Sequence, residues 1–208
     1  MFIIEGNIGA GKSTLINNLQ KYITDNNLTI NVVQEPVDKW LSFQNDNNDS
    51  ILSLFYNDIK KYAFSFQMYV MLTRFKELRK VLWPKTIVER SLYTDKEIFT
   101  KALTEDNNLS KIENKIIDEW VDELNQSITI HGLIYLKIAP KTCYERIRQR
   151  SRTSENNITI DYLTNLHNKH ESYISNWISS EKKLLIVEDN DELVVQKIIN
   201  FIDSTSIL

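Results

Sequence analysis

The sequence is poor in the residues that interrupt regular structure, because its 208 residues include only 4 glycines and 3 prolines. Flexible linkers and low-complexity segments are therefore excluded. The single cysteine, Cys143, excludes an intramolecular disulfide and favours a reducing compartment. No apolar run approaches the length that spans a bilayer. The formal net charge of −3 gives no overall attraction to nucleic acid or to an anionic membrane.

These absences lead to three expectations about the whole chain. Its length suits one compact domain, to which we assign residues 1–208. Met1 is followed at once by an apolar segment typical of a strand, so we expect no signal or transit peptide. We expect a cytoplasmic protein, in the host cytoplasm if its source is viral, that binds neither nucleic acid nor membrane.

Three of the four glycines fall in one segment, Gly6-Asn7-Ile8-Gly9-Ala10-Gly11-Lys12-Ser13-Thr14. Its spacing matches G-x-x-x-x-G-K-[ST], the phosphate-binding loop. Glycines allow positive φ, and consecutive N–H groups then face an anion at the positive end of the next helix. In this motif the lysine reaches the β- and γ-phosphates and the serine ligates Mg²⁺. We therefore predict that residues 6–14 bind a nucleoside triphosphate together with Mg²⁺.

Strand and helix patterns alternate along the whole chain. We expect strands at residues 2–5, 29–34, 86–88, 133–138 and 184–187. We expect helices at residues 12–26, 51–61, 63–82, 92–103, 110–126, 141–150, 160–179 and 192–202. This order predicts an α/β fold of the P-loop kinase type, with a doubly wound, five-stranded parallel sheet and helices on both faces. Ligands of such sheets bind beyond the carboxyl ends of the strands.

Charged residues follow two of these strands. Glu35 follows the second strand and Trp40 lies five residues later, where a general base and a cleft wall are expected. Taken alone, Glu35 also fits a surface carboxylate before a proline-fixed turn. Glu89 and Arg90 follow the third strand, the place of an acid beside Mg²⁺ and of a phosphate-binding cation. These two residues also fit a local ion pair.

Two helices carry further candidates. Gln67 and Arg74 are seven residues apart, so they share a helix face, and an amide can both donate to and accept from a nucleobase. An ordinary polar stripe is the alternative. Arg146, Arg150 and Arg152 are typical of a lid, at about residues 146–157, that folds cations over a transferring phosphoryl group. A solvated helix face and a local nucleic-acid patch are the alternatives there.

These segments together resemble the deoxyribonucleoside kinases, which include deoxycytidine and deoxyguanosine kinases, the insect multisubstrate enzyme and mitochondrial thymidine kinase. The resemblance covers essentially the whole chain. It rests on the glycine-rich segment and on Glu35-Pro36-Val37 with Trp40, Phe66-Gln67-x-Tyr69, Glu89-Arg90-Ser91-x-Tyr93 and Leu166-His167-x-Lys169-His170-Glu171-Ser172.

The resemblance implies phosphorylation of the 5′-hydroxyl of a deoxynucleoside, with ATP as donor and Mg²⁺ as cofactor. Glu35 corresponds to the base, and Arg90 to the cation that holds the 5′-oxygen and the incoming phosphate. Ser13 and Glu89 correspond to the Mg²⁺ site. The other implied catalytic cations are Lys12, Arg146, Arg150 and Arg152. The implied ATP contacts are residues 6–14, Arg146, and Glu188 and Asp189 after the last strand.

The resemblance also implies a nucleoside pocket. In it Gln67 bonds the base, Phe99 stacks on the base, and Tyr56 and Glu155 bind the 3′-hydroxyl. The full implied set is Glu35, Trp40, Tyr56, Phe66, Gln67, Arg74, Arg90, Asp95, Phe99 and Glu155. A homodimer is the family's usual state and is expected here.

Arg74 and Asp95 are expected to pair across the base pocket, and a structural salt bridge away from the base is the alternative. An acidic side chain there accepts from an exocyclic amine, which favours deoxycytidine or a purine deoxynucleoside over thymidine. The sequence does not choose among deoxycytidine, deoxyadenosine and deoxyguanosine. Two rival functions remain at this point. One is a thymidylate kinase-like nucleoside monophosphate kinase, and the other is a non-enzymatic protein that binds nucleotides through the same loop.

Overall fold

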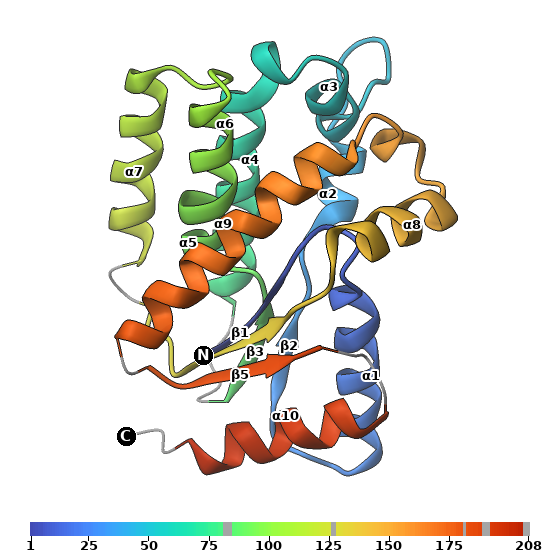
Figure 1. Cartoon of the computed structure of the whole chain (residues 1–208), viewed down its shortest axis with the longest axis vertical. Helices are drawn as coiled ribbons and strands as arrows, with labels where there is room; N and C mark the ends of the chain where they lie inside the picture. The colour runs from blue at the N-terminus through green and yellow to red at the C-terminus, as the bar shows by residue number, and fades with distance from the viewer. Residues whose placement is uncertain (81–84, 126–127, 181, 189–191, 206–208) are drawn as a thin grey trace.

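The computed structural model describes residues 1–80, 85–125, 128–180, 182–188 and 192–205. Its centre is one parallel sheet with the strand order β2-β3-β1-β4-β5 (Figure 1). The strands are β1 (Phe2–Gly6), β2 (Asn31–Val33), β3 (Thr86–Glu89), β4 (Gly132–Leu136) and β5 (Leu184–Val187). The predicted α/β class and the five-stranded parallel sheet are confirmed.

Alternate side chains of the central strand pack on opposite faces of the sheet. Phe2 and Ile4 belong to the core that faces α1 (Lys12–Asp25) and α10 (Glu192–Ser204). Ile3 packs instead with Trp177 of α9 (Ile160–Ser179). Since β1 and β4 are buried along their whole length, both faces must be covered by helices. Figure 1 shows α1 and α10 on one side of the sheet.

The remaining helices, apart from α8 (Pro140–Arg150), build the other part of the molecule, whereas Cys143 and Ile147 of α8 pack in the core with α1 and α10. The helices of this other part are α2 (Val37–Ser42), α3 (Ile51–Asn57), α4 (Ile59–Leu78), α5 (Leu92–Thr94), α6 (Lys101–Glu105) and α7 (Lys111–Asn125). In Figure 1, α4, α6 and α7 lie together at one end, beside the long α9. This end holds a second apolar core, built largely from α3, α4 and α7.

The predicted boundary between the helices at residues 51–61 and 63–82 is wrong. The two helices meet at Asp58 and not after Lys61, because the Asp58 side chain accepts from the backbone N–H of Lys61, 3.1 Å away, and caps α4. Helix α2 was not predicted. It has only six residues and begins directly after Pro36, so it is too short to show a helical pattern in the sequence. Helix α4 ends at Leu78, and residues 81–84 lie outside the described part of the chain.

The segment expected as one helix at residues 92–103 is interrupted. It consists of α5, a π-helical turn η1 at Asp95–Thr100, and α6. A π turn inserts an extra residue per turn and so changes which side chains share a face. Here Asp95 begins the turn and Phe99 lies within it, and both line the cavity described below.

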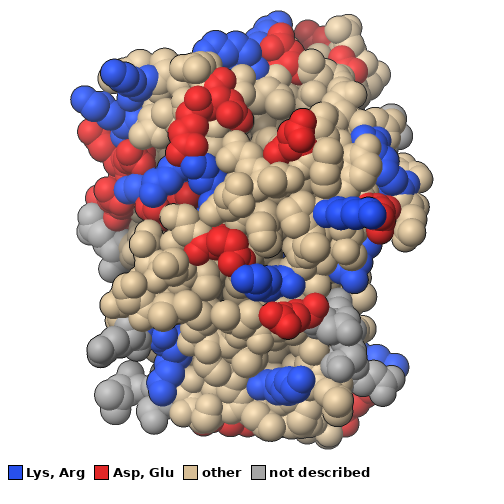
Figure 2. Space-filling view, in the orientation of Figure 1, with Lys and Arg blue, Asp and Glu red and all other residues tan. Residues whose placement is uncertain are grey.

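The surface carries both acidic and basic side chains. Figure 2 shows acidic and basic side chains interspersed on one face, with a largely uncharged area between them. Within the described residues, no helix combines the length and apolar character required to cross a membrane.

Candidate active site

A cavity of about 480 Å³ opens beside the carboxyl ends of β1, β2 and β3. It brings together most of the residues singled out in the sequence. The predicted residues that line it are Ile8, Gly9, Gly11, Lys12, Ser13, Thr14, Glu35, Trp40, Tyr56, Phe66, Gln67, Arg74, Glu89, Arg90, Asp95, Phe99, Arg146, Arg150, Arg152 and Glu155.

A few predicted residues do not line this cavity. Gly6, Asn7 and Ala10 belong to the loop but are buried and do not line the cavity. Glu188 is exposed after β5 and is not part of the lining. Asp189 lies outside the described residues.

The glycine-rich loop has the backbone that its sequence predicts. Gly9 has φ +78°, and a Cβ there would lie 2.5 Å from the backbone oxygen of Cys143, so only glycine fits. The Asn7 amide donates to the backbone oxygen of Leu163, 2.8 Å away, and ties the loop to α9. The ammonium of Lys12 curls over the loop and donates to the backbone oxygens of Gly6 and Asn7 at 3.0 and 2.9 Å.

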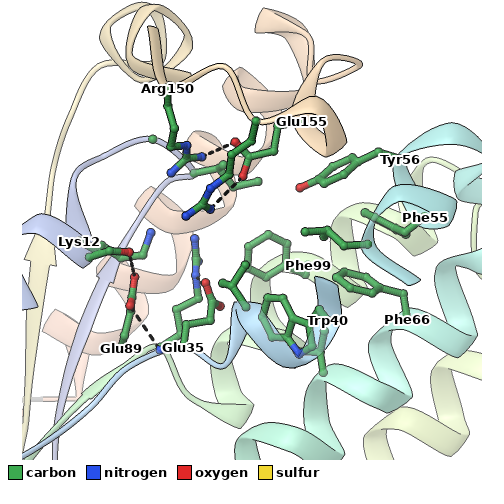
Figure 3. A pocket seen from close by; sticks show the side chains of 18 of the residues that line it. Lys12, Glu35, Trp40, Phe55, Tyr56, Phe66, Glu89, Phe99, Arg150 and Glu155 are labelled. Carbon is green, nitrogen blue, oxygen red and sulfur yellow. Dashed lines mark hydrogen bonds and ion pairs between the residues drawn. The ribbon is translucent and has the colours of Figure 1, made fainter. Parts of the chain in front are cut away.

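Ser13 and Glu89 meet as the sequence predicts for a metal site. The Ser13 hydroxyl donates to Glu89 Oε1 at 3.0 Å, although 76 residues separate them. The other carboxylate oxygen of Glu89 lies 3.3 Å from the backbone nitrogen of Glu35. Both oxygens therefore lie between the phosphate-binding loop and the end of β2 (Figure 3).

Glu35 lies between two buried arginines. Its Oε1 accepts from Arg74 Nη2 at 3.0 Å and lies 3.3 Å from Arg90 Nε. Burial alone would raise the pKa of Glu35, but the combined positive charge of Arg90, Arg74 and Lys12 outweighs burial and lowers it. The carboxylate is thus ionised at neutral pH, in the form that can accept a proton.

Arg90 has an unusual backbone and an incompletely paired side chain. Its φ is +64°, in the left-handed region that non-glycine residues rarely adopt. The guanidinium is 3% exposed and lies over the ring of Phe99, 4.7 Å from its centroid. Its Nη1 has no hydrogen-bond partner among the described residues. A buried cation with a free donor beside a phosphate-binding loop is suited to an anionic ligand.

The predicted pair between Arg74 and Asp95 is confirmed. Arg74 Nε donates to Asp95 Oδ2 at 2.8 Å, and both side chains are almost wholly buried. The same guanidinium also donates to the backbone oxygen of Glu89, 2.9 Å away, and to Glu35. The sequence did not indicate this link between Arg74 and Glu35, because nothing local relates two residues 39 positions apart.

Aromatic rings form the wall opposite the charged groups (Figure 3). Phe66 stacks on Phe55 at 4.5 Å and meets the edge of Trp40 at 5.7 Å. Gln67, from the next position of α4, is 3% exposed and its Oε1 has no partner among the described residues. A flat apolar slot with one unpaired amide oxygen suits a heteroaromatic ring that carries a donor.

Sequence reasoning missed six lining residues. They are Val37, Leu52, Phe55, Val70, Gln149 and Tyr162. Five of these are apolar or aromatic residues at ordinary helical spacing, which does not distinguish a cavity wall from a core.

The expected lid carries its own ion pairs. Arg150 ends α8, and Glu155 belongs to the short 3-10 turn η2 (Thr153–Glu155). Glu155 is paired with Arg150, and its Oε1 lies 3.4 Å from Arg152 Nη1. Arg146 points instead to the loop and donates to the backbone oxygen of Ala10 at 2.9 Å. In Figure 3 the Tyr56 hydroxyl is directed towards the Glu155 side of the cavity.

A phosphate-binding loop beyond a parallel sheet, a carboxylate between cations and an arginine-rich lid together define a phosphotransferase of the P-loop class. Comparison with known proteins gives the family. A model of the deoxynucleoside kinase family matches residues 2–205. The chain belongs to the deoxynucleoside kinase family, and its activity is the phosphorylation of nucleosides in nucleotide salvage.

Individual relatives agree with this assignment. A probable deoxycytidine kinase of Fowlpox virus (strain NVSL) is 40% identical over 195 residues, which cover 91% of this chain and 77% of that protein. The deoxycytidine kinase of Homo sapiens is 35% identical over 195 residues, which cover 82% and 74%. The mitochondrial deoxyguanosine kinase of Xenopus laevis is 32% identical over 194 residues, which cover 83% and 72%.

Replacement of Glu35 by glutamine is expected to remove a general base while keeping its shape. We predict a fall in kcat of roughly 10²–10⁴-fold, with little change in the affinity for triphosphate. Rapid-quench turnover and fluorescence titration of a nucleotide analogue measure the two quantities. A Glu35→Gln enzyme that turns over like the wild type would exclude Glu35 from the mechanism.

Glu89→Gln can keep the hydrogen bond from Ser13 but removes the only negative charge that the proposed site offers to a divalent cation. We predict that half-maximal activity then requires more Mg²⁺, and that Lys12→Ala abolishes activity at every Mg²⁺ concentration by weakening the donor-phosphate contact. A Mg²⁺ titration of the three proteins checks both expectations. If the Glu89→Gln curve overlays that of the wild type, Glu89 is not part of a metal site.

Proposed function

We propose that this kinase transfers the γ-phosphoryl group of ATP to the 5′-hydroxyl of a deoxynucleoside, with deoxycytidine or a purine deoxynucleoside preferred to thymidine. We take residues 1–208 as one kinase domain whose lid is at about residues 146–157. The observation that carries the proposal is the position of Glu35. It lies in one cavity with the phosphate-binding loop, held between Arg74 and Arg90 at 3.0 and 3.3 Å.

The charged residues have complementary roles in this proposal. Glu35 accepts the proton of the 5′-hydroxyl as the oxygen attacks. Because the transition state of phosphoryl transfer is loose, a weakly basic carboxylate such as that of Glu35 is sufficient. Lys12, Arg90 and the lid arginines Arg146, Arg150 and Arg152 stabilise the charge on the transferring oxygens. Glu155 and Tyr56 hold the 3′-hydroxyl and so orient the sugar.

Mg²⁺ is the proposed cofactor, held by Ser13 and Glu89. Their oxygens lie 3.0 Å apart beside the loop, and one hydroxyl with one carboxylate is the sparse donor set that Mg²⁺ uses next to substrate phosphates. Among the described residues, no three His, Cys, Asp or Glu side chains are grouped to hold a metal unaided. When bound, Mg²⁺ neutralises charge on the β- and γ-phosphate oxygens.

The base preference is proposed from the buried pair at the end of the cavity. Asp95 is 1% exposed and is held by Arg74, so its carboxylate can accept from an exocyclic amine. Gln67 and Phe99 line the same cavity, where the proposed roles are a hydrogen bond from the amide to the base and stacking of the ring on it. Thymidine would set a carbonyl and a methyl group against the charged pair, and sites built for a donor can discriminate by up to roughly 10⁴–10⁵-fold.

An acceptor panel tests the function and the base preference together. The panel contains deoxycytidine, deoxyadenosine, deoxyguanosine, thymidine and their monophosphates, each with ATP and Mg²⁺. We expect turnover of the amine-bearing deoxynucleosides and little turnover of monophosphates, because the negative charge of Glu35 suits an acceptor hydroxyl and would repel an acceptor phosphate. Activity confined to monophosphates would overturn the proposed function.

The double variant Arg74→Met, Asp95→Ala is expected to shift the preference towards thymidine. Arg74 also holds Glu35, so kcat will fall for all acceptors, and the informative quantity is the ratio of kcat/KM for thymidine to that for deoxycytidine. A loss of kcat that is the same for all acceptors cancels in this ratio. Asp95→Asn keeps the shape and is the matched control. A wild-type enzyme that already prefers thymidine would contradict the proposed preference.

A homodimer is proposed from the outer face of α7. Ile112, Ile116 and Trp120 are four residues apart, share one side of the helix, and are 64%, 37% and 49% exposed. Such a stripe is the kind of surface that a second copy of the same helix covers. A cytoplasmic location is proposed because Cys143, the sole cysteine, is a buried free thiol.

Trp120→Glu is expected to place a charge in this apolar stripe and produce monomers. Sedimentation equilibrium of the wild type and the variant measures the change in mass. Ile178→Glu, at a residue of α9 that is 56% exposed, is the matched control and should leave the mass unchanged. A monomeric wild-type protein would refute the proposed dimer.

A further inference from the structure

One buried acidic side chain lies behind the phosphate-binding loop and has no part in the chemistry described so far. Glu5 immediately precedes the loop on β1 and has no exposed surface. It forms no salt bridge with any side chain in the described part of the chain, and its Oε2 has no hydrogen-bond partner there. Its Oε1 accepts a hydrogen bond from the hydroxyl of Thr94. A buried carboxyl group with a single hydrogen-bond partner needs a structural or functional explanation.

Thr94 belongs to the turn that starts α5. The backbone nitrogen of Ser91 donates to Thr94 Oγ1 at 2.9 Å, and the backbone nitrogen of Thr94 donates to Ser91 Oγ at 3.2 Å. The two hydroxyls are also 3.2 Å apart. Thr94 gives its single hydroxyl proton to Glu5, so Ser91 must be the donor between the hydroxyls. Glu5 thereby fixes the direction of the hydrogen bond between the two hydroxyls.

The residue before this cap is Arg90. Its left-handed backbone, with φ +64°, is held on one side by its N–H, which donates to the backbone oxygen of Ile4 at 3.0 Å. On the other side the chain enters the Ser91–Thr94 cap. Consecutive residues of β1 therefore hold both sides of Arg90: Ile4 through its backbone and Glu5 through the side chain of Thr94. A strained conformation persists only when its surroundings determine it in this way.

We propose that Glu5 is a positioning residue for phosphoryl transfer, which acts through Thr94 and the α5 cap to keep the Arg90 guanidinium beside Glu35. This inference rests on the role proposed above for Arg90. The hydrogen bond needs an acceptor at Oε1 and not a charge. Burial, which outweighs the nearby cations, raises the pKa of Glu5 to about 7, and Oε1 can accept whether or not a proton is on Oε2.

Two matched pairs of variants test the hydrogen bond. Thr94→Val has nearly the shape of threonine without the hydroxyl, whereas Thr94→Ser keeps the hydroxyl. Glu5→Leu removes the acceptor, whereas Glu5→Gln keeps one. We expect Thr94→Val and Glu5→Leu to lower kcat roughly 10–100-fold, the effect of a displaced catalytic group. The KM for ATP should change by less than about threefold, and the Ser and Gln variants should keep kcat within about threefold of the wild type.

The same variants in an Arg90→Lys background show whether the effect passes through Arg90. If it does, Thr94→Val and Glu5→Leu add little to the loss that Arg90→Lys causes alone. Thermal unfolding identifies any variant that does not fold. If Glu5→Leu fails to fold, the Thr94 pair and Glu5→Gln still decide the question.

Several results would overturn the inference. The first is a Thr94→Val enzyme with the kcat of the wild type. The second is a Glu5→Gln enzyme that loses as much kcat as Thr94→Val. The third is a loss from Thr94→Val or Glu5→Leu that is as large in the Arg90→Lys background as in the wild type. A rise confined to the KM for ATP would place the effect in the loop instead. Wild-type enzyme in the same assay reports on the proposed function by itself. If Arg90→Lys alone turns over normally, the role of Arg90 fails and the positioning role fails with it.

Discussion

The guanidinium of Arg74 is 3% exposed and joins three parts of the site. It donates to Asp95 in the π turn, to Glu35 after β2, and to the backbone oxygen of Glu89 at the end of β3. A buried cation is tolerated only when it is paired and hydrogen-bonded, and here every partner is itself a group of the site. Removal of the cation would leave Asp95 without its cationic partner and Glu35 with Arg90 alone, and breaking a buried pair of this kind costs about 3–5 kcal/mol. The geometry of Glu35 and Asp95 therefore depends on one side chain from α4.

Other cations of the cavity are also balanced by nearby carboxylates. Lys12 and Arg90 face Glu35, and burial together with the charge of Arg90 lowers the pKa of Lys12 to about 8, despite the neighbouring carboxylates. Lys12 stays mostly protonated at neutral pH and can meet a phosphate. Glu155 in turn neutralises two lid arginines. All of these cations line the same cavity, where they can face an anionic substrate together.

Opposite this charged side, the slot of Trp40, Phe55 and Phe66 is apolar. Most of the charge comes from the strand ends, the loop and α8, whereas α2, α3 and α4 supply the rings. Arg74 of α4 is the exception, since it reaches the charged side. Such a division lets one wall bind a flat base by contact area while the other acts on the sugar hydroxyl and phosphate. The π turn connects the two, because it carries both Asp95 and Phe99.

The sequence by itself determined the sheet and the glycine-rich loop, because strand and helix periodicity, positive-φ glycines and motif spacing are properties of neighbouring residues. Tyr56, Phe99 and Glu155 were predicted at the cavity only through the resemblance to the deoxyribonucleoside kinases. The sequence also predicted the pair of Arg74 with Asp95. Only the tertiary structure decided that Arg74 holds Glu35, that a π turn interrupts residues 92–105, and that Glu5 reaches Thr94, 89 positions away. Contacts of this kind depend on how whole elements pack, and packing between distant segments leaves no local pattern in the chain.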